Sequence, residues 1–514
     1  MSQTKRAYDK FLLYALLIIA LGVVGFISAT TILDPNYLTT TGPVDASEYR
    51  LSSVNKTDIF AYPQQPASYI VWENGGTYYA KSGETGVIDF SGPLFSTVYQ
   101  AAIDAVETAG GGAVLLRPGN FVVRASVVPK DNVNLFGSGR FQSILVGHSD
   151  LVNTAIIQLI GGSTSNYLEN VTISDIGFQG KDMHKVGYHV DRKAIYIKYV
   201  LNGNFLNLWI NGTSATGLGP DYLVNCVIDN VLAENCGTTG QTGGSNGIGI
   251  AVNNDNETSI ISNCIARGNA NYGIIYEGSS TDGDGNYLIS NCISYNNRIG
   301  IGAAGASKVT IDSCSSFDNS VDGVTSTNFN LLASDYFTVT SNKVFNNTQH
   351  GVHIYATAAE YSIISDNMLW GNTGDNVYVR GDYITIQNNI MIGERIVIKA
   401  DCSNVLVQGN ILHGTTIVDE PADTTIKNNK GHVTENIGAA TILSGTTNIT
   451  ITHGLAYTPT SANTEWTVSY LENPTNDPGS WYITGFNATN AIIHVFRDPG
   501  ASHLDIAWSA RRTP

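Results

Sequence analysis

The sequence predicts an all-β chain in which a parallel β-helix, a solenoid of short strands, occupies most of the length. Two observations carry the prediction. Short runs of alternating apolar and polar residues end in Asn or Gly turns and recur about every two dozen residues, without helical stretches between them. The 514 residues include 53 Gly and are 42% hydrophobic but only 14% charged, which excludes a coiled coil and a disordered acidic chain.

The charge balance argues against a nucleic-acid partner. Lys and Arg total 27 against 43 Asp and Glu, a formal net charge of -16. No broad basic surface is therefore available to hold a phosphate backbone.

The N-terminus predicts a membrane anchor. Residues 11–33 carry no charge and, as a helix, are long enough to span the roughly 30 Å hydrocarbon core of a bilayer. Lys5, Arg6 and Lys10 precede this run, so residues 1–10 are expected in the cytoplasm and the bulk of the chain outside the cell, joined through a linker at 34–65. The alternative is a signal peptide whose cleavage releases a secreted protein.

The repeat itself is a ladder of about eleven coils. In each coil a small or amide residue stands three positions after an apolar residue, which is usually β-branched. Further along the coil follow a second row of Asn residues and a row of Gly residues. A tight turn that faces such amides inward would let them bond along the solenoid axis. The best-aligned steps are Ile261-Ser-Asn-Cys264, Ile289-Ser-Asn-Cys292, Ile311-Asp-Ser-Cys314, Val339-Thr-Ser-Asn342, Ile364-Ser-Asp-Asn367, Ile386-Gln-Asn-Asn389, Val407-Gln-Gly-Asn410 and Ile426-Lys-Asn-Asn429.

The cysteines follow the same ladder. Cys264, Cys292 and Cys314 occupy the row that later coils fill with Asn, so we expect reduced, buried and stacked thiols. The pattern leaves Cys226 and Cys236 undecided.

The segment before the ladder carries a further set of motifs. They are Tyr69-Ile-Val-Trp72, Thr77-Tyr-Tyr-Ala80, the helical face Val98, Ala101, Ala102 and Ala105, Gly110-Gly-Gly-Ala-Val-Leu-Leu-Arg-Pro-Gly119 and Val133-Asn-Leu-Phe-Gly137. Together they resemble the opening of the pectate lyase superfamily. The resemblance covers 66–432, with 66–150 as the capping and first-coil segment, and it implies a right-handed β-helix whose first coil is covered by a short α-helix. It is specific for fold and weak for activity, because that superfamily includes lyases, hydrolases, epimerases, phage tailspikes and inert surface proteins.

Residues 433–514 predict a separate β-sandwich, because period-2 strands alternate there with Gly, Pro and Asn turns. Capping of the last coil is the favoured role. Sugar binding through Trp466, Trp481 and Trp508, or assembly of a homotrimer, is the alternative.

Candidate site residues lie on one predicted outer strand face. The residues two and four positions after each coil Gly should point outward. The middle of this face is small and smooth, and its C-terminal end is aromatic and basic, which suits an anionic sugar such as a uronate. Tyr196, Lys198, Glu277, Tyr378 and Lys399 are the predicted substrate contacts.

The same face favours elimination over hydrolysis. Glycoside hydrolysis needs a pair of carboxylates, and Glu277 has no outward carboxylate on its next three coils. β-Elimination from a uronate needs a base and nearby positive charge, which His353, Tyr355 and Arg380 could supply as catalytic residues. An ordinary exposed strand face is the alternative interpretation.

Two further segments carry weaker patterns. Asp282, Asp284 and Asn286 alternate like calcium ligands, although the position where an EF-hand has Glu is Ile293; a flexible turn is the other interpretation, and no cofactor is required. The charged segment 181–193 suggests the lip of a groove, with a solvated loop as the default.

The functional expectation is therefore an exported, membrane-anchored surface protein that binds an acidic extracellular polysaccharide; if it is also an enzyme, β-elimination is the expected reaction. The competing expectation is a non-catalytic structural, adhesive or spike protein.

Overall fold

A computed structural model describes residues 67–514 except 184–187, 242–243, 253–256, 279–284, 328–333, 356–358, 420–423, 472–475, 501–502 and 513–514. The predicted membrane segment and linker lie outside these residues. Among the helices of the described part, none is long and apolar enough to cross a membrane.

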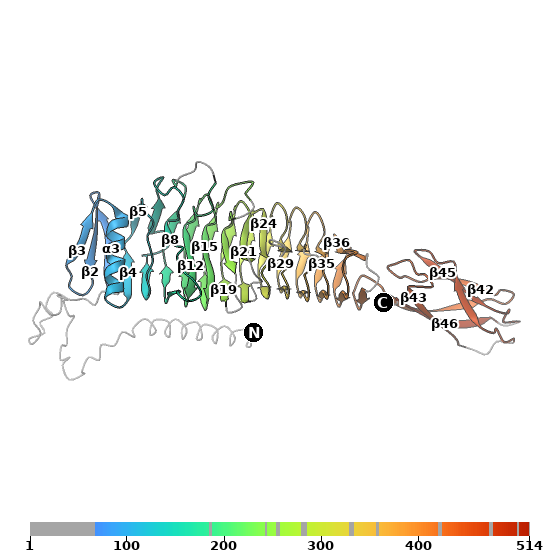
Figure 1. Cartoon of the computed structure of the whole chain (residues 1–514). Coiled ribbons are helices and arrows are strands. Elements are labelled where there is room, and N and C mark those ends of the chain that lie inside the picture. Colours follow the sequence, from blue (N-terminus) through green and yellow to red (C-terminus); the bar gives the residue numbers. More distant parts are fainter. Residues whose placement is uncertain are drawn as a thin grey trace, which may run out of the picture. The chain divides into compact units, whose positions relative to one another are not determined.

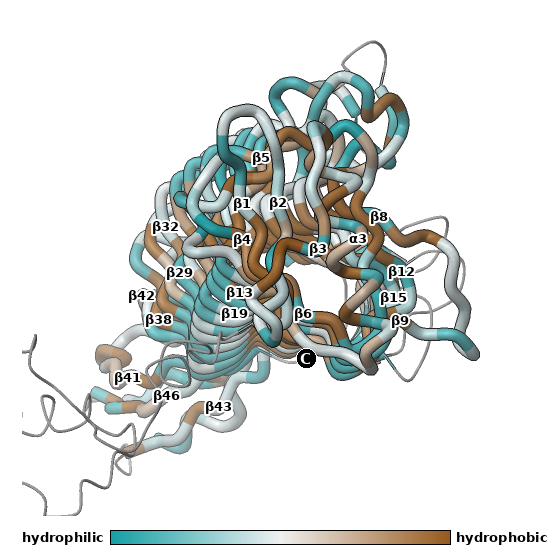
Figure 2. The backbone as a smooth tube through the Cα atoms, turned by 90° about the vertical axis from the view of Figure 1, so that its left-hand side faces the viewer, coloured by the Kyte–Doolittle hydropathy of each residue, from teal (hydrophilic) through white to brown (hydrophobic). Residues whose placement is uncertain are grey.

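The described chain is a parallel β-helix in which successive coils add strands to three sheets (Figure 1). The strands of neighbouring coils pair in parallel and in register, so the ladder of about eleven coils is confirmed. Figure 2 shows these coils stacked behind one another.

Sheet A has 16 strands. They are β3 (Ile88–Gly92), β2 (Thr77–Ser82), β1 (Tyr69–Asn74), β4 (Gly112–Leu116), β6 (Val133–Phe136), β10 (Thr172–Ser174), β13 (Asn204–Leu206), β16 (Cys226–Asp229), β19 (Thr258–Ser262), β22 (Asn286–Ser290), β25 (Val309–Asp312), β28 (Thr338–Thr340), β31 (Ile363–Ser365), β34 (Thr385–Gln387), β37 (Leu406–Gln408) and β40 (Thr425–Lys427).

Sheets B and C have 12 strands each. Sheet B contains β5 (Gly119–Val123), β7 (Ser143–Gly147), β11 (Gly177–Gln179), β14 (Trp209–Asn211), β17 (Leu232–Glu234), β20 (Ile265–Arg267), β23 (Ile293–Tyr295), β26 (Ser315–Phe317), β29 (Lys343–Phe345), β32 (Met368–Trp370), β35 (Ile390–Ile392) and β38 (Ile411–His413). Sheet C contains β8 (Ile157–Leu159), β9 (Leu168–Glu169), β12 (Ile195–Leu201), β15 (Leu218–Val224), β18 (Ile248–Val252), β21 (Tyr272–Gly278), β24 (Ile299–Ala304), β27 (Val324–Thr327), β30 (Val352–Ile354), β33 (Val377–Val379), β36 (Arg395–Ile398) and β39 (Thr416–Asp419).

A helix covers the start of the solenoid. The helix α3 (Phe95–Thr108) buries Val98 and Ala102 of the predicted face, while Ala101 and Ala105 are half-buried. Its larger anchors are aromatic: the ring of Phe95 lies 5.0 Å from that of Tyr99 and 4.9 Å from that of Phe121 on β5. An open solenoid end would expose its core, and this packing closes it.

The Asn row forms a continuous internal ladder. Residues such as Asn263 and Asn388 adopt positive φ, a conformation that Asn tolerates better than most residues, and so turn the next side chain inward. There the Nδ2 of Asn342 donates to the Oδ1 of Asn367 at 3.0 Å and to the carbonyl of Ile311 at 2.9 Å. Each buried amide is thereby satisfied by the neighbouring coils, which couples the coils and explains the repeat.

The cysteines behave as predicted. All six are free and buried, and Cys264, Cys292 and Cys314 continue the ladder. The backbone N–H of Cys314 donates to the Oδ1 of Asn342 at 2.8 Å, so thiol and amide occupy equivalent slots. Burial raises the pKa of Cys226 to about 12, which keeps that thiol protonated and unreactive.

The C-terminal module consists of two three-stranded antiparallel sheets. Trp508 belongs to its apolar core, and Trp466 and Trp481 pack against that core. Burial places Trp508 in the core, while sugar binding through the partly buried Trp466 and Trp481 stays a prediction. Arg512 forms an ion pair with Asp419 of β39. The strands are β41 (Glu435–Ile442), β46 (Leu504–Arg512) and β43 (Thr464–Tyr470) in one sheet, and β42 (Asn448–Thr452), β45 (Asn490–Val495) and β44 (Trp481–Thr484) in the other.

Candidate functional site

A pair of carboxylates lies on the outer face of sheet C. Ala251 on β18 pairs with Glu277 on β21. On the other side of β18, the backbone N–H of Ala251 donates to the Oδ1 of Asp221 on β15 at 2.9 Å. Asp221 and Glu277 therefore flank the small side chain of Ala251, two coils apart. At about 4.8 Å per coil, their strand positions are about 9.6 Å apart.

Glycines make room for polar groups between these carboxylates. A Cβ on Gly219 would lie 2.9 Å from the Nζ of Lys193, so only Gly leaves space for that ammonium group. A Cβ on Gly249 would lie 2.8 Å from the Nδ2 of Asn246. This Nδ2 is buried, and the Asn246 side chain lies close enough to Glu277 to favour the ionised form of that carboxylate. We call the four residues Asp221, Glu277, Lys193 and Asn246 the carboxylate notch.

Burial shifts the protonation of both carboxylates. It raises the pKa of Glu277 from 4.5 to about 7, against the lowering effect of the Lys193 ammonium. Burial also raises the pKa of Asp221, which Lys193 and the Ala251 N–H oppose. Desolvation disfavours the charged form of an acid. Near neutral pH, the notch can therefore hold a proton on Glu277.

Two lysines flank the notch on its β12 side. The Nζ of Lys193 lies 3.8 Å from the ring centroid of Tyr196, and that of Lys198 lies 5.3 Å from it. Tyr196 is buried beneath them, so this predicted contact supports the lysines and does not face an open surface. Arg192 and Lys193 are also buried, which corrects the default interpretation of this end of segment 181–193 as a solvated loop.

Of the predicted catalytic residues, His353 lies on β30, and Tyr355 and Arg380 directly follow β30 and β33, further along sheet C. The His353 ring is 5.2 Å from that of Tyr355 and 5.0 Å from that of Tyr378. His353 is 8% exposed, and its Nδ1 lies 2.9 Å from the Oδ2 of Asp322. The structure thus brings the predicted histidine and tyrosines together, with an acidic neighbour that the sequence analysis did not name.

The positive charge predicted at this end is compensated by acids. Arg380 donates from Nε and Nη2 to the Oδ2 of Asp401 at 3.0 and 2.6 Å. Arg395 donates to the Oδ1 of Asp375 at 2.7 Å. An arginine held this way is less available to a substrate carboxylate than the sequence pattern indicated.

We call His353, Tyr355, Tyr378 and Asp322 the histidine cluster. Tyr272 separates the notch from this cluster. Its ring packs with Ile275, Ile299 and Ala304 in a small apolar cluster. A Cβ on Gly302 would lie 2.9 Å from this ring, so the strand face that looked smooth in the sequence is covered. The two groups of polar residues are therefore distinct sites.

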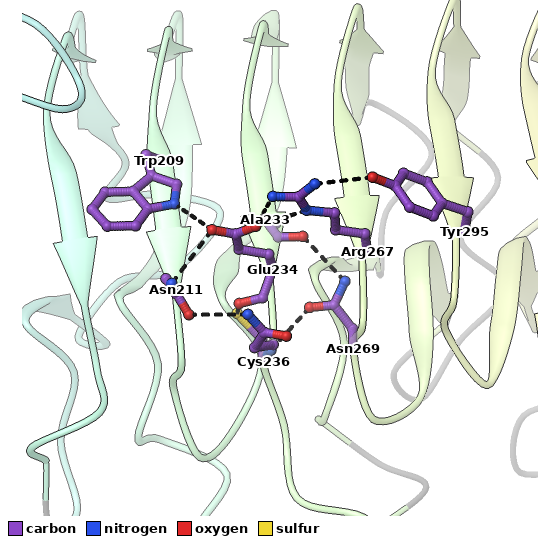
Figure 3. A network of polar contacts seen from close by, with 9 residues as sticks. Trp209, Asn211, Ala233, Glu234, Cys236, Arg267, Asn269 and Tyr295 are labelled. Atoms are coloured by element: carbon purple, nitrogen blue, oxygen red, sulfur yellow. Dashed lines mark hydrogen bonds and ion pairs between the residues drawn. The ribbon is translucent and has the colours of Figure 1, made fainter.

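Another polar network lies on sheet B (Figure 3). Glu234 accepts from the Nε1 of Trp209 at 2.8 Å and from the Nε of Arg267 at 2.7 Å, and the Nη1 of Arg267 donates to the hydroxyl of Tyr295 at 3.0 Å. The polar groups of this network pair with one another across neighbouring coils. We therefore assign the network a structural role.

Sequence analysis missed Asp221, and with it the carboxylate pair. Its coil carries Gly217 followed by Leu218, whereas the Gly row was aligned on Gly before a β-branched residue. Counting two and four positions from Gly217 gives Gly219 and Asp221, so the signal was present. The carboxylate partner of Glu277 lies on an earlier coil, not on the three coils that follow it.

The calcium candidate falls largely outside the described residues. Asp282 and Asp284 lie there, and Asn286 is the exposed first residue of β22. Calcium binding at this position stays a prediction.

Comparisons with known proteins agree on the fold. A family model described as "Right handed beta helix region" matches residues 281–391. Among solved structures, the A-module of mannuronan C-5 epimerase AlgE6 from Azotobacter vinelandii is 19% identical, with a TM-score of 0.46, covering 65% of this chain and 94% of that one. The Pseudomonas phage phi297 tailspike gp61 is 13% identical, with a TM-score of 0.50, covering 80% and 92%. The Yersinia enterocolitica family 28 exopolygalacturonase is 12% identical, with a TM-score of 0.43, covering 69% and 83%.

A search of curated proteins gave no match. At 13% identity, the likeness to the tailspike shows the fold alone. The family match over residues 281–391 and the three-sheet coil agree with the right-handed β-helix fold that the opening segment predicts.

Proposed function

We propose that this protein hydrolyses an acidic extracellular polysaccharide at the carboxylate notch. The observation that carries the proposal is the pair Asp221 and Glu277, which flank the small outward residue Ala251 and whose pKa values burial raises. The proposal rests on this site, because one fold supports many activities.

The two carboxylates take different roles. Glu277, protonated up to about pH 7, donates its proton to the glycosidic oxygen as that bond breaks. Lys193 and the Ala251 N–H favour the ionised form of Asp221. Asp221 therefore accepts a proton from the water that attacks the anomeric carbon. A separation of about 6.5 to 9.5 Å between carboxyl groups leaves room for that water and leads to inversion at the anomeric carbon. The strand positions of Asp221 and Glu277, about 9.6 Å apart, lie near the upper end of this range and far from the roughly 5 Å of retaining enzymes.

Lys198 supports an anionic substrate. It is half-buried at the edge of the notch, in a chain whose net charge is -16. A neutral polysaccharide would gain nothing from this charge, whereas a uronate could pair with it.

Elimination at the histidine cluster is the second candidate. The contact of Asp322 with the Nδ1 of His353 fixes the ring beside Tyr378, as a base and an acid would require. The ion pair of Arg380 with Asp401 weighs against it, so we place hydrolysis first.

The test is a screen of the purified full chain on a panel of acidic polysaccharides. Reducing ends report any cleavage, and ultraviolet absorbance reports the unsaturated product that only elimination makes. We expect reducing ends without absorbance, and a loss of at least about a hundredfold in kcat for Glu277→Gln and Asp221→Asn. Glu435→Gln, an exposed position on β41, is the control and should retain full activity.

Each other result rejects the proposal in a defined way. Absorbance that vanishes in His353→Gln would establish elimination at the histidine cluster. Binding without cleavage would favour the adhesive or structural role, membrane-anchored or secreted. Full activity in Glu277→Gln would remove the notch from the reaction.

A further inference from the structure

A row of alternating acids and histidine lies just before the sheet C strands of three consecutive coils. Asp322, His350 and Asp375 each stand two residues before a strand, and β27, β30 and β33 pair in register. The strand spacing of about 4.8 Å therefore separates each member of the row from the next. Such a spacing lets side chains of neighbouring coils converge on one atom.

His353 joins this row from β30. The centroids of its ring and that of His350 are 4.6 Å apart. One potential ligand atom from each of Asp322, His350 and His353 can be chosen so that all three lie within 4.8 Å of one another. Asp322 is 4% exposed, so this is an interior group and not a chance meeting of surface side chains.

Two features do not fit a purely structural role. The Nε2 of His353 is buried and has no hydrogen-bond partner among the residues that the structure describes. A buried imidazole normally uses both nitrogens. The backbone N–H of Asp375 donates to the Nδ1 of His350 at 3.2 Å, and the Oδ2 of Asp375 lies 3.3 Å from the same nitrogen. Arg395 in turn holds the Asp375 carboxylate. In the tautomer whose Nδ1–H is donated to this carboxylate, His350 has the outer support that metal-binding histidines have, and its Nε2 lone pair is available to an ion.

We propose that Asp322, His350 and His353 bind a divalent transition-metal ion. Two imidazoles and one carboxylate suit a borderline ion such as Zn²⁺, Co²⁺ or Ni²⁺, whereas Ca²⁺ and Mg²⁺ prefer oxygen ligands. Three protein ligands leave one position of a tetrahedral ion for water or an anionic ligand. The ion links the coils of β27 and β30. This site is independent of the carboxylate notch, from which Tyr272 separates it.

The test is calorimetric titration of the full chain, stripped of metal by a chelator, with Zn²⁺ and separately with Ca²⁺. We expect the parent to bind Zn²⁺. His353→Gln and Asp322→Asn should each either bind one Zn²⁺ ion fewer than the parent or bind the ion at this site at least about a hundredfold more weakly. His413→Gln removes an exposed histidine on β38 and should bind like the parent.

A second measurement needs no variant. Co²⁺ added to the stripped parent should give the visible absorption of a four- or five-coordinate ion with nitrogen ligands, and equimolar Zn²⁺ should remove it. Zn²⁺ binding that is equal in the parent and in folded His353→Gln would overturn the proposal, as would a parent with neither Zn²⁺ uptake nor a Co²⁺ band. Hydrolysis at the notch could fail its own test without affecting either result.

Discussion

Glu277→Gln should change the pH dependence of stability as well as activity. The folded protein raises the pKa of Glu277 from 4.5 to about 7 through burial. In the unfolded chain this carboxyl ionises above about pH 4.5, whereas in the folded chain it stays protonated until about pH 7. The contribution of Glu277 to the free energy of unfolding is therefore largest below pH 4.5. It falls as pH rises to about 7 and is constant above that pH. A shift of this size corresponds to about 3 kcal/mol.

Gln cannot ionise, so the variant lacks this loss. The difference in free energy of unfolding between Glu277→Gln and the parent should move in favour of the variant by about 3 kcal/mol between pH 4 and pH 8. Denaturant titration of both proteins at a series of pH values measures it, with Glu435→Gln as the exposed control. Activity of the parent should also fall as pH rises through about 7, because the general acid loses its proton. A pH-independent difference in unfolding free energy would refute the raised pKa of Glu277 and with it the role of this residue as the general acid.

The remaining predictions address the notch, the ladder and the arginine. Gly219→Ala should displace Lys193 and lower kcat at least about tenfold, with little change in thermal stability; an active variant would show that the position of the lysine is unimportant. Asn342→Ala should lower the free energy of unfolding by about 2 to 4 kcal/mol, measured by denaturant titration, because it removes the side-chain partners of the Ile311 carbonyl and the Cys314 backbone N–H. Arg380→Ala should weaken binding of acidic glycans about ten- to a hundredfold if Arg380 contacts the substrate carboxylate; unchanged affinity in a calorimetric titration would show that its ion pair is structural.

The fold could be predicted in detail because its constraints are local. A turn residue that tolerates positive φ, followed by a small or amide residue that faces inward, recurs in each coil and is visible in the sequence around Cys264 or Asn389. Strand pairing between neighbouring coils then follows from the repeat. The free thiols were predictable for the same reason, since they share slots with the amides.

The candidate site was predictable only in part. Glu277, Tyr196 and Lys198 were identified by counting along the coils. Their environment was not, because a count shows which way a side chain leaves its strand and not what covers it. The burial that raises the pKa of Glu277 depends on groups from other coils and loops.

The sequence by itself determined the β-helix, the inward ladder and the strand face on which polar residues gather, since each follows from residues within one coil. Only the tertiary structure decided which of those residues share a site. Asp221 and Glu277 flank Ala251 because coils of unequal length return to the same register. The Lys193 ammonium lies against Gly219, which has no side chain, and its charge lowers the pKa values of both carboxylates. Asp322 meets His353 across one coil. The charge of a carboxylate or imidazole depends on these distances and on the exclusion of water, and both come from the packing of coils distant in sequence.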